Sequence, residues 1–454
     1  MLVFIVATFI VGYACIALEH PIKINKTATA LLLGVLLWTL YALSHAQFAS
    51  LIPEGSTWTN ELTHHLGSTA EIVFFLLGAM TIVTLVDEYQ GFRIITNLIH
   101  TRNKKKLLWT LSIITFFLSA VLDNMTTAIV MCALLRKLIS DQKERWLFAG
   151  MVILAANAGG AWSPIGDVTT IMLWIGGQVT TVNIMVKTLL ASLVCLIVPC
   201  LILGATLKGD IEAPKETSEG VQIDQRWQRL IFFVGIGALI FVPIFKTITH
   251  LPPYLGMLFG LSVLWILTEI ISRKHSHEKM KLPTAMKTLE HIDTPSILFF
   301  LGILMAVACL ETCGALGMLA GGLNSTFIDM HAGSEPIGFF IIDLIIGVLS
   351  SIIDNVPLVA ASMGMYPLSG EEVLFATNHP FWEFLAYCAG TGGSLLIIGS
   401  AAGVAVMGME KIDFIWYLKK ISPLALAGYL AGAVVFILMD VTLFEKIEWL
   451  RNLA

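Results

Sequence analysis

The stretch FFLSAVLDNMTTAIVM, residues 116–131, places a carboxylate and an amide, Asp123 and Asn124, inside an apolar run. A second stretch, IGVLSSIIDNVPLVAA at 346–361, repeats the pair at Asp354 and Asn355 between similar apolar flanks. An ionised Asp at the centre of a bilayer costs roughly 3 kcal/mol on insertion scales, so such a residue persists where it pairs, protonates or binds an ion. Two matching pairs indicate a common role rather than an accident of placement.

The composition of the chain indicates a membrane protein. Of its 454 residues, 57% are hydrophobic and 13% are charged, and the mean hydropathy is +0.84. Soluble proteins carry about 25% charged residues. A hydrocarbon core needs roughly 20 helical residues per crossing, and the candidate crossings are 1–17, 27–44, 69–87, 146–175, 185–207, 230–246, 254–272, 295–313, 381–408 and 421–441. We therefore predict an all-α polytopic membrane protein of about ten crossings, whose partner is the lipid bilayer and which binds no nucleic acid.

The two Asp-Asn segments, 107–135 and 336–367, are predicted to be re-entrant hairpins. Only about a dozen residues follow Asp123 before the basic pair at 136–137, and their rise of about 18 Å is too short for a core of about 30 Å. Basic residues flank the first hairpin, whereas the flanks of the second carry acidic residues only: Asp329, Glu335, Glu371 and Glu372. The two hairpins are thus expected to enter the membrane from opposite sides.

The positive charges also orient the chain. Of the 27 Lys and Arg residues, 23 fall in six segments that we assign to the cytoplasm: 18–26, 88–106, 136–145, 208–229, 273–294 and 410–420. Both termini then lie in the periplasm, and the predicted location is a bacterial inner membrane.

The spacing of the motifs reveals an internal repeat. Asp123 and Asp354 are 231 residues apart, and the stretches NAGGAWSPIG (157–166) and GTGGSLLIIG (390–399) share three glycines at an offset of 233. Each half holds five crossings and one hairpin, and an odd number of crossings inverts the second half, as in many secondary transporters. The predicted halves are 1–207, with hairpin 107–135 and broken helix 146–175, and 230–454, with hairpin 336–367 and broken helix 381–408. A cytoplasmic linker, 208–229, joins them.

The polar residues near the breaks are the candidate site. A membrane helix is interrupted only where its freed backbone groups face protein or water, and hard cations prefer carboxylate, amide, hydroxyl and carbonyl oxygens. The candidates for binding cation or proton in the first half are Asp123, Asn124, Thr126, Thr127, Asn157, Asp167, Thr169 and Thr170. Those in the second half are Ser350, Ser351, Asp354, Asn355, Thr391, Ser394 and Ser400. Sodium is expected at Asp123, Asn124, Asp354 and Asn355, and accessory roles are open to Glu71, Glu311 and Asp343.

Purely structural roles compete with these assignments. Asp and Asn cap helices well, so Asp123, Asp354 and Asp167 could simply cap the helices that follow them. Serine and threonine hydroxyls in membrane spans often serve helix packing. Glu71 lies near the end of its span, where its side chain could reach water.

The motifs LDNMTTAIV, NAGGAWSPIGDVTT, IIDNVPLVAAS and GTGGSLLIIGSAAG resemble those of NhaD-type sodium/proton antiporters of the ion transporter superfamily. The resemblance covers essentially the whole chain. It implies an inverted-repeat fold, a homodimer with a scaffold domain that supports a moving transport domain, and extrusion of sodium in exchange for protons. Dicarboxylate carriers of the superfamily have Ser-Asn-Thr at the hairpin tips. Here the first tip has Asp123 in place of Ser, and the second has Pro357 where a hydroxyl would be expected.

The predicted function is therefore Na⁺(Li⁺)/H⁺ antiport by alternating access, with no enzymatic activity and no cofactor beyond the transported ions. An organic anion or arsenite carrier of the same superfamily is the alternative, although an Asp at each tip would repel a di- or tricarboxylate. A sodium channel is a second alternative. An intramembrane aspartyl protease is a remote one, because such an enzyme has no need of the duplicated Asp-Asn pairs or the inverted halves.

Overall fold

The computed structural model describes residues 1–17, 19–51, 57–96, 101–211, 223–274, 283–328, 335–368 and 374–444. Within these ranges the chain is helical and contains no strand. Residues 212–222 of the linker, the acidic residues Asp329, Glu371 and Glu372, and the last ten residues of the second half lie outside the described residues.

The helices of the first half follow the predicted order. They are α1 (Leu2–Ala17), α2 (Glu19–Ile22), α3 (Lys26–Ser44), α4 (Trp58–Glu88), α5 (Arg93–Thr96), α6 (Lys104–Leu122), α7 (Asn124–Leu138), α8 (Gln142–Gly160), α9 (Val168–Ile175) and α10 (Thr181–Thr206). Those of the second half are α11 (Gln225–Thr249), α12 (Pro253–Lys274), α13 (Ala285–His291), α14 (Thr294–Thr312), α15 (Ala315–Leu323), α16 (Glu335–Leu349), α17 (Asn355–Met365), α18 (Pro380–Gly392), α19 (Ala401–Glu410), α20 (Phe414–Lys420) and α21 (Ser422–Met439).

Eight of the described helices are long and apolar enough to cross a membrane. Seven of them coincide with predicted crossings, and the eighth is α6, the first limb of the predicted hairpin 107–135. The predicted crossings 146–175 and 381–408 are each interrupted, as α8 followed by α9 and α18 followed by α19. The fold class, an all-α polytopic membrane protein with two broken helices, is confirmed.

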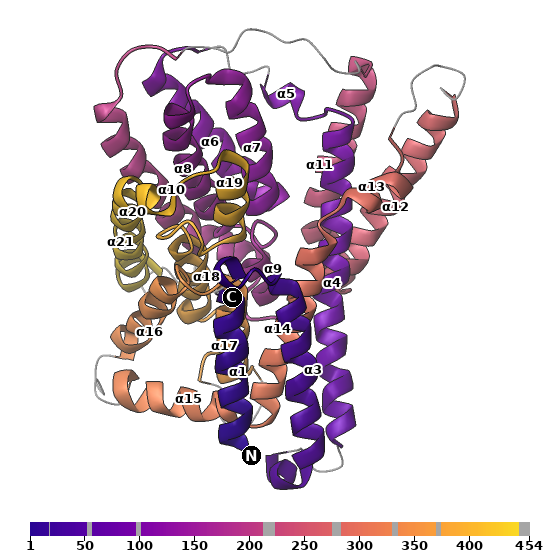
Figure 1. Cartoon of the computed structure of the whole chain (residues 1–454), viewed down its shortest axis with the longest axis vertical. Helices are drawn as coiled ribbons and strands as arrows, with labels where there is room; N and C mark the ends of the chain where they lie inside the picture. The colour runs from indigo at the N-terminus through magenta and orange to yellow at the C-terminus, as the bar shows by residue number, and fades with distance from the viewer. Residues whose placement is uncertain are drawn as a thin grey trace.

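Both Asp-Asn segments form a helix, a sharp turn and a second helix. At the first tip Asp123 joins α6 to α7 with a φ of 105°, a left-handed region that few non-glycine residues adopt. At the second tip the turn 350–354 joins α16 to α17. Figure 1 shows α6 and α7 in the upper half of the molecule, α16 and α17 in the lower half, and α9 and α18 between them. The turn is therefore present at each tip, while entry and exit on one side of the bilayer stays a prediction.

The same contacts recur in both halves at the offsets of the sequence repeat. Ser119 Oγ donates to the carbonyl oxygen of Ala156 at 2.6 Å, and Ser350 Oγ donates to that of Ala389 at 2.7 Å. Each bond ties the first limb of a hairpin to the broken helix beside it. The Asp at each tip caps the helix that follows, and so does the residue that ends each break, Asp167 or Ser400. The two halves thus share a local architecture as well as a motif.

Two glycines allow each broken helix to touch its hairpin. A Cβ added to Gly159 would lie 2.2 Å from the carbonyl oxygen of Phe116, and one added to Gly392 would lie 2.0 Å from that of Gly347. Real Cβ atoms do not approach oxygen so closely, so only glycine fits at these two crossings. The breaks are consequently held directly against α6 and α16.

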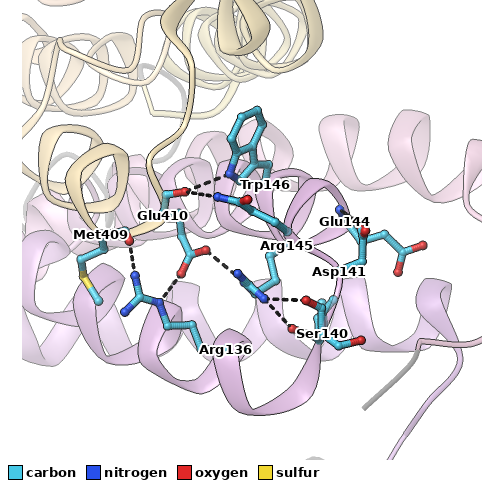
Figure 2. A network of polar contacts seen from close by, with 10 residues as sticks. Arg136, Ser140, Asp141, Glu144, Arg145, Trp146, Met409 and Glu410 are labelled. Carbon is cyan, nitrogen blue, oxygen red and sulfur yellow. Dashed lines mark hydrogen bonds and ion pairs between the residues drawn. The ribbon is translucent and has the colours of Figure 1, made fainter. Parts of the chain in front are cut away.

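A buried acidic residue fixes the end of the second broken helix to the first hairpin. Figure 2 shows Glu410, at the end of α19, between Arg136 of α7 and Arg145 of α8. Its two oxygens lie 2.6 Å from Arg136 Nε and 3.0 Å from Arg145 Nε, while its carbonyl oxygen accepts from Trp146 Nε1 at 3.0 Å. Glu410 is only 2% exposed, so this ion pair anchors α19 against α7 and α8.

Candidate functional site

Asp167 is the polar centre at which the two hairpin tips meet. Its Oδ2 accepts a hydrogen bond from Asn124 Nδ2 at 2.6 Å, and Asn355 Nδ2 lies 3.3 Å from each of its oxygens. Asn124 is the first residue of α7 and Asn355 the first residue of α17, so each tip supplies one amide. All three side chains are buried.

The break between α8 and α9 places this carboxylate. Asp167 caps α9, because its Oδ1 accepts from both the backbone N–H and the hydroxyl of Thr169 at 3.0 Å. Thr170 completes the cap by accepting from the backbone N–H of Asp167 at 3.2 Å. Asp167 therefore does cap α9, mainly through Oδ1. Its carboxylate also accepts hydrogen bonds from the two tip amides.

Asn157 links the surroundings of Asp167 to the second broken helix. Its Oδ1 accepts from Asn124 Nδ2 at 3.1 Å, and its Nδ2 donates to Ser394 Oγ at 2.8 Å and Ser400 Oγ at 2.9 Å. We refer to the buried residues Asn124, Asn157, Asp167, Asn355, Ser394 and Ser400 as the Asp167 cluster. It gathers one or more side chains from both hairpin tips and both broken helices.

The cluster is asymmetric although the fold is repeated. At the repeat offset of 233, Ser400 of the second half stands where the first half has Asp167. Both tip amides therefore contact Asp167, which is the one carboxylate at the end of a break. This leaves one acidic group at the meeting point and a hydroxyl at the equivalent position.

The two tip carboxylates bind their own helices. Asp123 accepts from the backbone N–H of Thr126 at 2.8 Å and from its hydroxyl at 2.7 Å. Asp354 accepts from the backbone N–H of Val356 at 3.2 Å and lies 3.8 Å from Lys26 Nζ. Both carboxylates are close enough to Asp167 to act on it electrostatically. Direct sodium ligation by Asp123 or Asp354 stays a prediction.

Three further predicted hydroxyls, outside the Asp167 cluster, serve packing or capping in this structure. Thr126 donates to Asp123, Ser350 donates to the carbonyl oxygen of Ala389, and Thr391 donates to that of Tyr387 at 2.6 Å. These contacts hold the cluster in place without entering it.

The accessory carboxylates lie apart from the cluster. Glu71 on α4 interacts electrostatically with Lys246 of α11. Glu311 on α14 approaches Gly364 of α17, where an added Cβ would lie 3.0 Å from its Oε2. Asp343 on α16 is fully buried. Sequence reasoning missed Glu383 and Glu410, because each lies beside a helix end and carries no motif.

Comparison with known proteins places this arrangement in a family. A family model described as "Citrate transporter" matches residues 13–378. The chain is 47% identical over 440 residues to Sodium/proton antiporter 1 of Arabidopsis thaliana, covering 96% of this chain and 72% of that protein. It is 30% identical over 461 residues to the Na⁺/H⁺ antiporter NhaD of Vibrio cholerae, covering 95% of this chain and 90% of that protein.

The chain belongs to the NhaD-type antiporter family. Among solved structures, the YdaH transporter of Alcanivorax borkumensis has a similar fold, with a TM-score of 0.54, 13% sequence identity and coverage of 92% of this chain and 98% of that one. Membership of the NhaD-type family confirms that this is a multi-pass membrane transporter and not an enzyme, which excludes the protease alternative.

Proposed function

We propose that the protein exchanges Na⁺, and Li⁺ as its congener, for H⁺ across the membrane, and that both ions use the Asp167 cluster. The observation that carries the proposal is the convergence of two tip amides on one buried carboxylate, with Asn124 at 2.6 Å and Asn355 at 3.3 Å. Relatives named sodium/proton antiporters support it.

The chemistry of the cluster suits a small hard cation. Carboxylate, amide carbonyl and hydroxyl oxygens are the ligands that such cations prefer, and the cluster offers all three. The amides of Asn124 and Asn355 now donate to Asp167, so a cation that binds there takes their place at the carboxylate. Rotation of either side-chain amide by about 180° would then direct its oxygen, instead of its N–H group, at the cation.

Exchange follows because one carboxylate can hold a proton or a cation but cannot hold both well. A buried ionised Asp is costly without compensation. In the proposed cycle, the site at Asp167 opens to one face of the membrane and then to the other, each time with either a proton or a cation bound. Competition between the proton and the cation for Asp167 couples their movements. Asp123 and Asp354 contribute negative potential that favours cations, and each retains its predicted place as a direct or indirect ligand.

The family model's description makes an organic anion carrier the second candidate. The carboxylates of Asp123 and Asp354 both act electrostatically on that of Asp167. Lys26 offsets part of the charge of Asp354 at 3.8 Å, and the three carboxylates still leave an excess of negative charge around this cluster. No Lys or Arg donates to Asn124, Asn157 or Asn355 in the hydrogen bonds formed by the described part of the chain. Like charges repel strongly at low dielectric, so this cluster favours a cation over citrate.

We also propose the orientation and the assembly. On the positive-inside rule, linker 208–229 would lie in the cytoplasm and both termini in the periplasm of a bacterial inner membrane. The resemblance to the family suggests a homodimer in which the hairpins and broken helices move against a scaffold of the remaining helices.

Transport assays in everted membrane vesicles test the proposed function. Vesicles that have built up a pH gradient receive NaCl, LiCl, sodium-free citrate, succinate or arsenite in parallel, with vesicles lacking the protein as control. We expect NaCl and LiCl to dissipate the gradient and the anions to leave it unchanged. A response to citrate or arsenite without a sodium response would support the anion carrier. Sodium flux that never moves protons would support a channel.

A further inference from the structure

A second buried cluster of charged residues lies between α10, α16 and α18. Asp343 of α16 is fully buried, and neither of its carboxylate oxygens has a hydrogen-bond partner among the residues that the structure describes. Glu383 of α18, also fully buried, is the charged residue that acts on it. Helix α16 packs against α18, which in turn packs against α10 and α21. An unpartnered carboxylate beside a second one is costly, so its retention needs a reason.

The surroundings distinguish the two carboxylates. Glu383 Oε1 accepts from Asn183 Nδ2 at 2.7 Å, and Lys187 Nζ lies 3.8 Å from its Oε2. Glu383 also sits in the first turn of α18, where the helix dipole favours negative charge. These contacts favour the ionised form at Glu383 more than at Asp343, although Glu383 Oε2 itself accepts no hydrogen bond among the described residues. Asp343 has none of these contacts, and an ionised carboxylate buried without hydrogen bonds costs several kcal/mol, so its surroundings favour the protonated form.

In many proton-transferring sites, two neighbouring acids have different surroundings, so that one stays protonated while the other is ionised. The other titratable residues that face Asp343 are Cys388 of α18, Tyr366 after α17 and Tyr429 of α21. Those that face Glu383 are Lys187 of α10 and Asp440 after α21, and His379 in turn faces Lys187. Aromatic and thiol neighbours provide little competing charge at Asp343, which leaves Glu383 as the group that sets its state.

The position of this pair relates it to the Asp167 cluster. Asp343 precedes Ser350 by seven residues, or about 10 Å along α16, and the turn after Ser350 leads to the second tip. On its other side, Lys187 Nζ donates to the carbonyl oxygen of Asn378 at 3.2 Å, in the connection that enters α18. The pair thus lies between that connection and the Asp167 cluster, on the side from which the second hairpin is predicted to enter.

We propose that Asp343 is a second proton-binding site, held next to ionised Glu383 and Lys187, which supplies protons to the Asp167 cluster from the side of the second hairpin. The inference rests on the proposed sodium/proton exchange and specifies the route of the proton. A proton from that side binds the carboxylate of Asp343, and the same proton leaves it toward the Asp167 cluster as sodium departs. No sodium ligand is assigned to Asp343.

Two transport modes of the purified protein in proteoliposomes separate this role from a structural one. The first is exchange of internal Na⁺ for external ²²Na⁺ at equal pH, which needs no proton. The second is sodium-driven proton movement, followed with an internal pH dye. For Asp343→Asn we expect ²²Na⁺ exchange to stay within about twofold of the unaltered protein and proton movement to fall by at least about tenfold. Glu383→Gln should shift the pH dependence of proton movement toward lower pH, because a negative neighbour that favours the protonated Asp343 is lost.

Ser192→Ala is the matched control. Ser192 lies on α10, is fully buried, and its hydroxyl has no partner among the described residues, so neither mode should change. Unchanged proton movement in Asp343→Asn would overturn the proposal, and so would an equal loss of both modes in that variant. If the unaltered protein exchanges ²²Na⁺ but moves no protons, the proposed antiport fails and the proton site fails with it.

Discussion

Asn124 Nδ2 lies 2.6 Å from Asp167 Oδ2, and this bond joins the tip of the first hairpin to the end of the first break. Asn355 Nδ2 approaches the same carboxylate from the second tip, at 3.3 Å from each oxygen. Two residues that are 231 positions apart in sequence thus meet at one acid that has no acidic counterpart in the second repeat. The shorter bond from the first tip suggests unequal parts for the two amides.

Substitution of the two amides should reveal that inequality. In the proposed exchange a rotated Asn124 amide presents its oxygen to the cation, so Asn124→Ala removes one ligand and should raise the KM for Na⁺ by roughly 10- to 100-fold. Asn355→Ala should raise it by less, because its contacts are longer. Initial rates over a sodium series in vesicles give both values from matched preparations. Equal effects, or a larger effect at Asn355, would contradict the asymmetry of the cluster.

The glycine contacts between the broken helices and the hairpins should tolerate no side chain. Gly159→Ala and Gly392→Ala each bring a Cβ into van der Waals overlap with a backbone oxygen, at 2.2 Å and 2.0 Å. Overpacking of this kind costs about 1–3 kcal/mol and displaces the break. We expect lower thermal stability in detergent together with loss of transport. Gly237→Ala on α11, with nothing within 4 Å of its added Cβ, is the control that should remain stable.

The ion pair in Figure 2 should contribute to stability more than an exposed pair does. Glu410→Gln leaves Arg136 and Arg145 without their shared carboxylate. Because the Arg136 side chain is 48% exposed, we expect a loss of about 1–3 kcal/mol, smaller than for a fully buried pair. Glu269→Gln is the comparison, since Glu269 pairs with an exposed Arg273 at 4.0 Å and exposed pairs contribute about 0–1 kcal/mol. Thermal unfolding followed by tryptophan fluorescence measures both. Similar unfolding temperatures for the two variants would show that the ion pairs of Glu410 do not stabilise the packing of α19.

Much of this architecture could be predicted from sequence because hydrophobic length and repeated motifs encode it. The Asp-Asn tips and the spaced glycines located both hairpin turns and both breaks, since a buried polar pair and a broken helix are costly in a membrane unless protein or water surrounds them. The identity of the central carboxylate could not be predicted in the same way. The sequence does not distinguish Asp123, Asp354 and Asp167. The structure shows that each caps its own helix and that both tip amides approach Asp167.

Two further acids could not be predicted because their partners are distant in sequence. Glu383 meets Lys187 and Asn183 from a helix about 200 residues away, and Glu410 meets Arg136 across 274 residues. Neither acid belongs to a periodic pattern or a repeated motif. Their pairing depends on how α18 and α19 pack against α10 and α7, which sequence spacing alone does not specify.

Asp167 is the residue that we propose binds the exchanged ions. The most direct test of this proposal is sodium-induced pH recovery in everted vesicles that contain Asp167→Asn, with Asp167→Glu and the unaltered protein at matched membrane levels. Asparagine preserves the size of the side chain but removes its charge, so recovery should fall by at least about a hundredfold, while glutamate should retain part of it. Full recovery by Asp167→Asn over the whole pH range would contradict the account and return the ion site to Asp123 and Asp354.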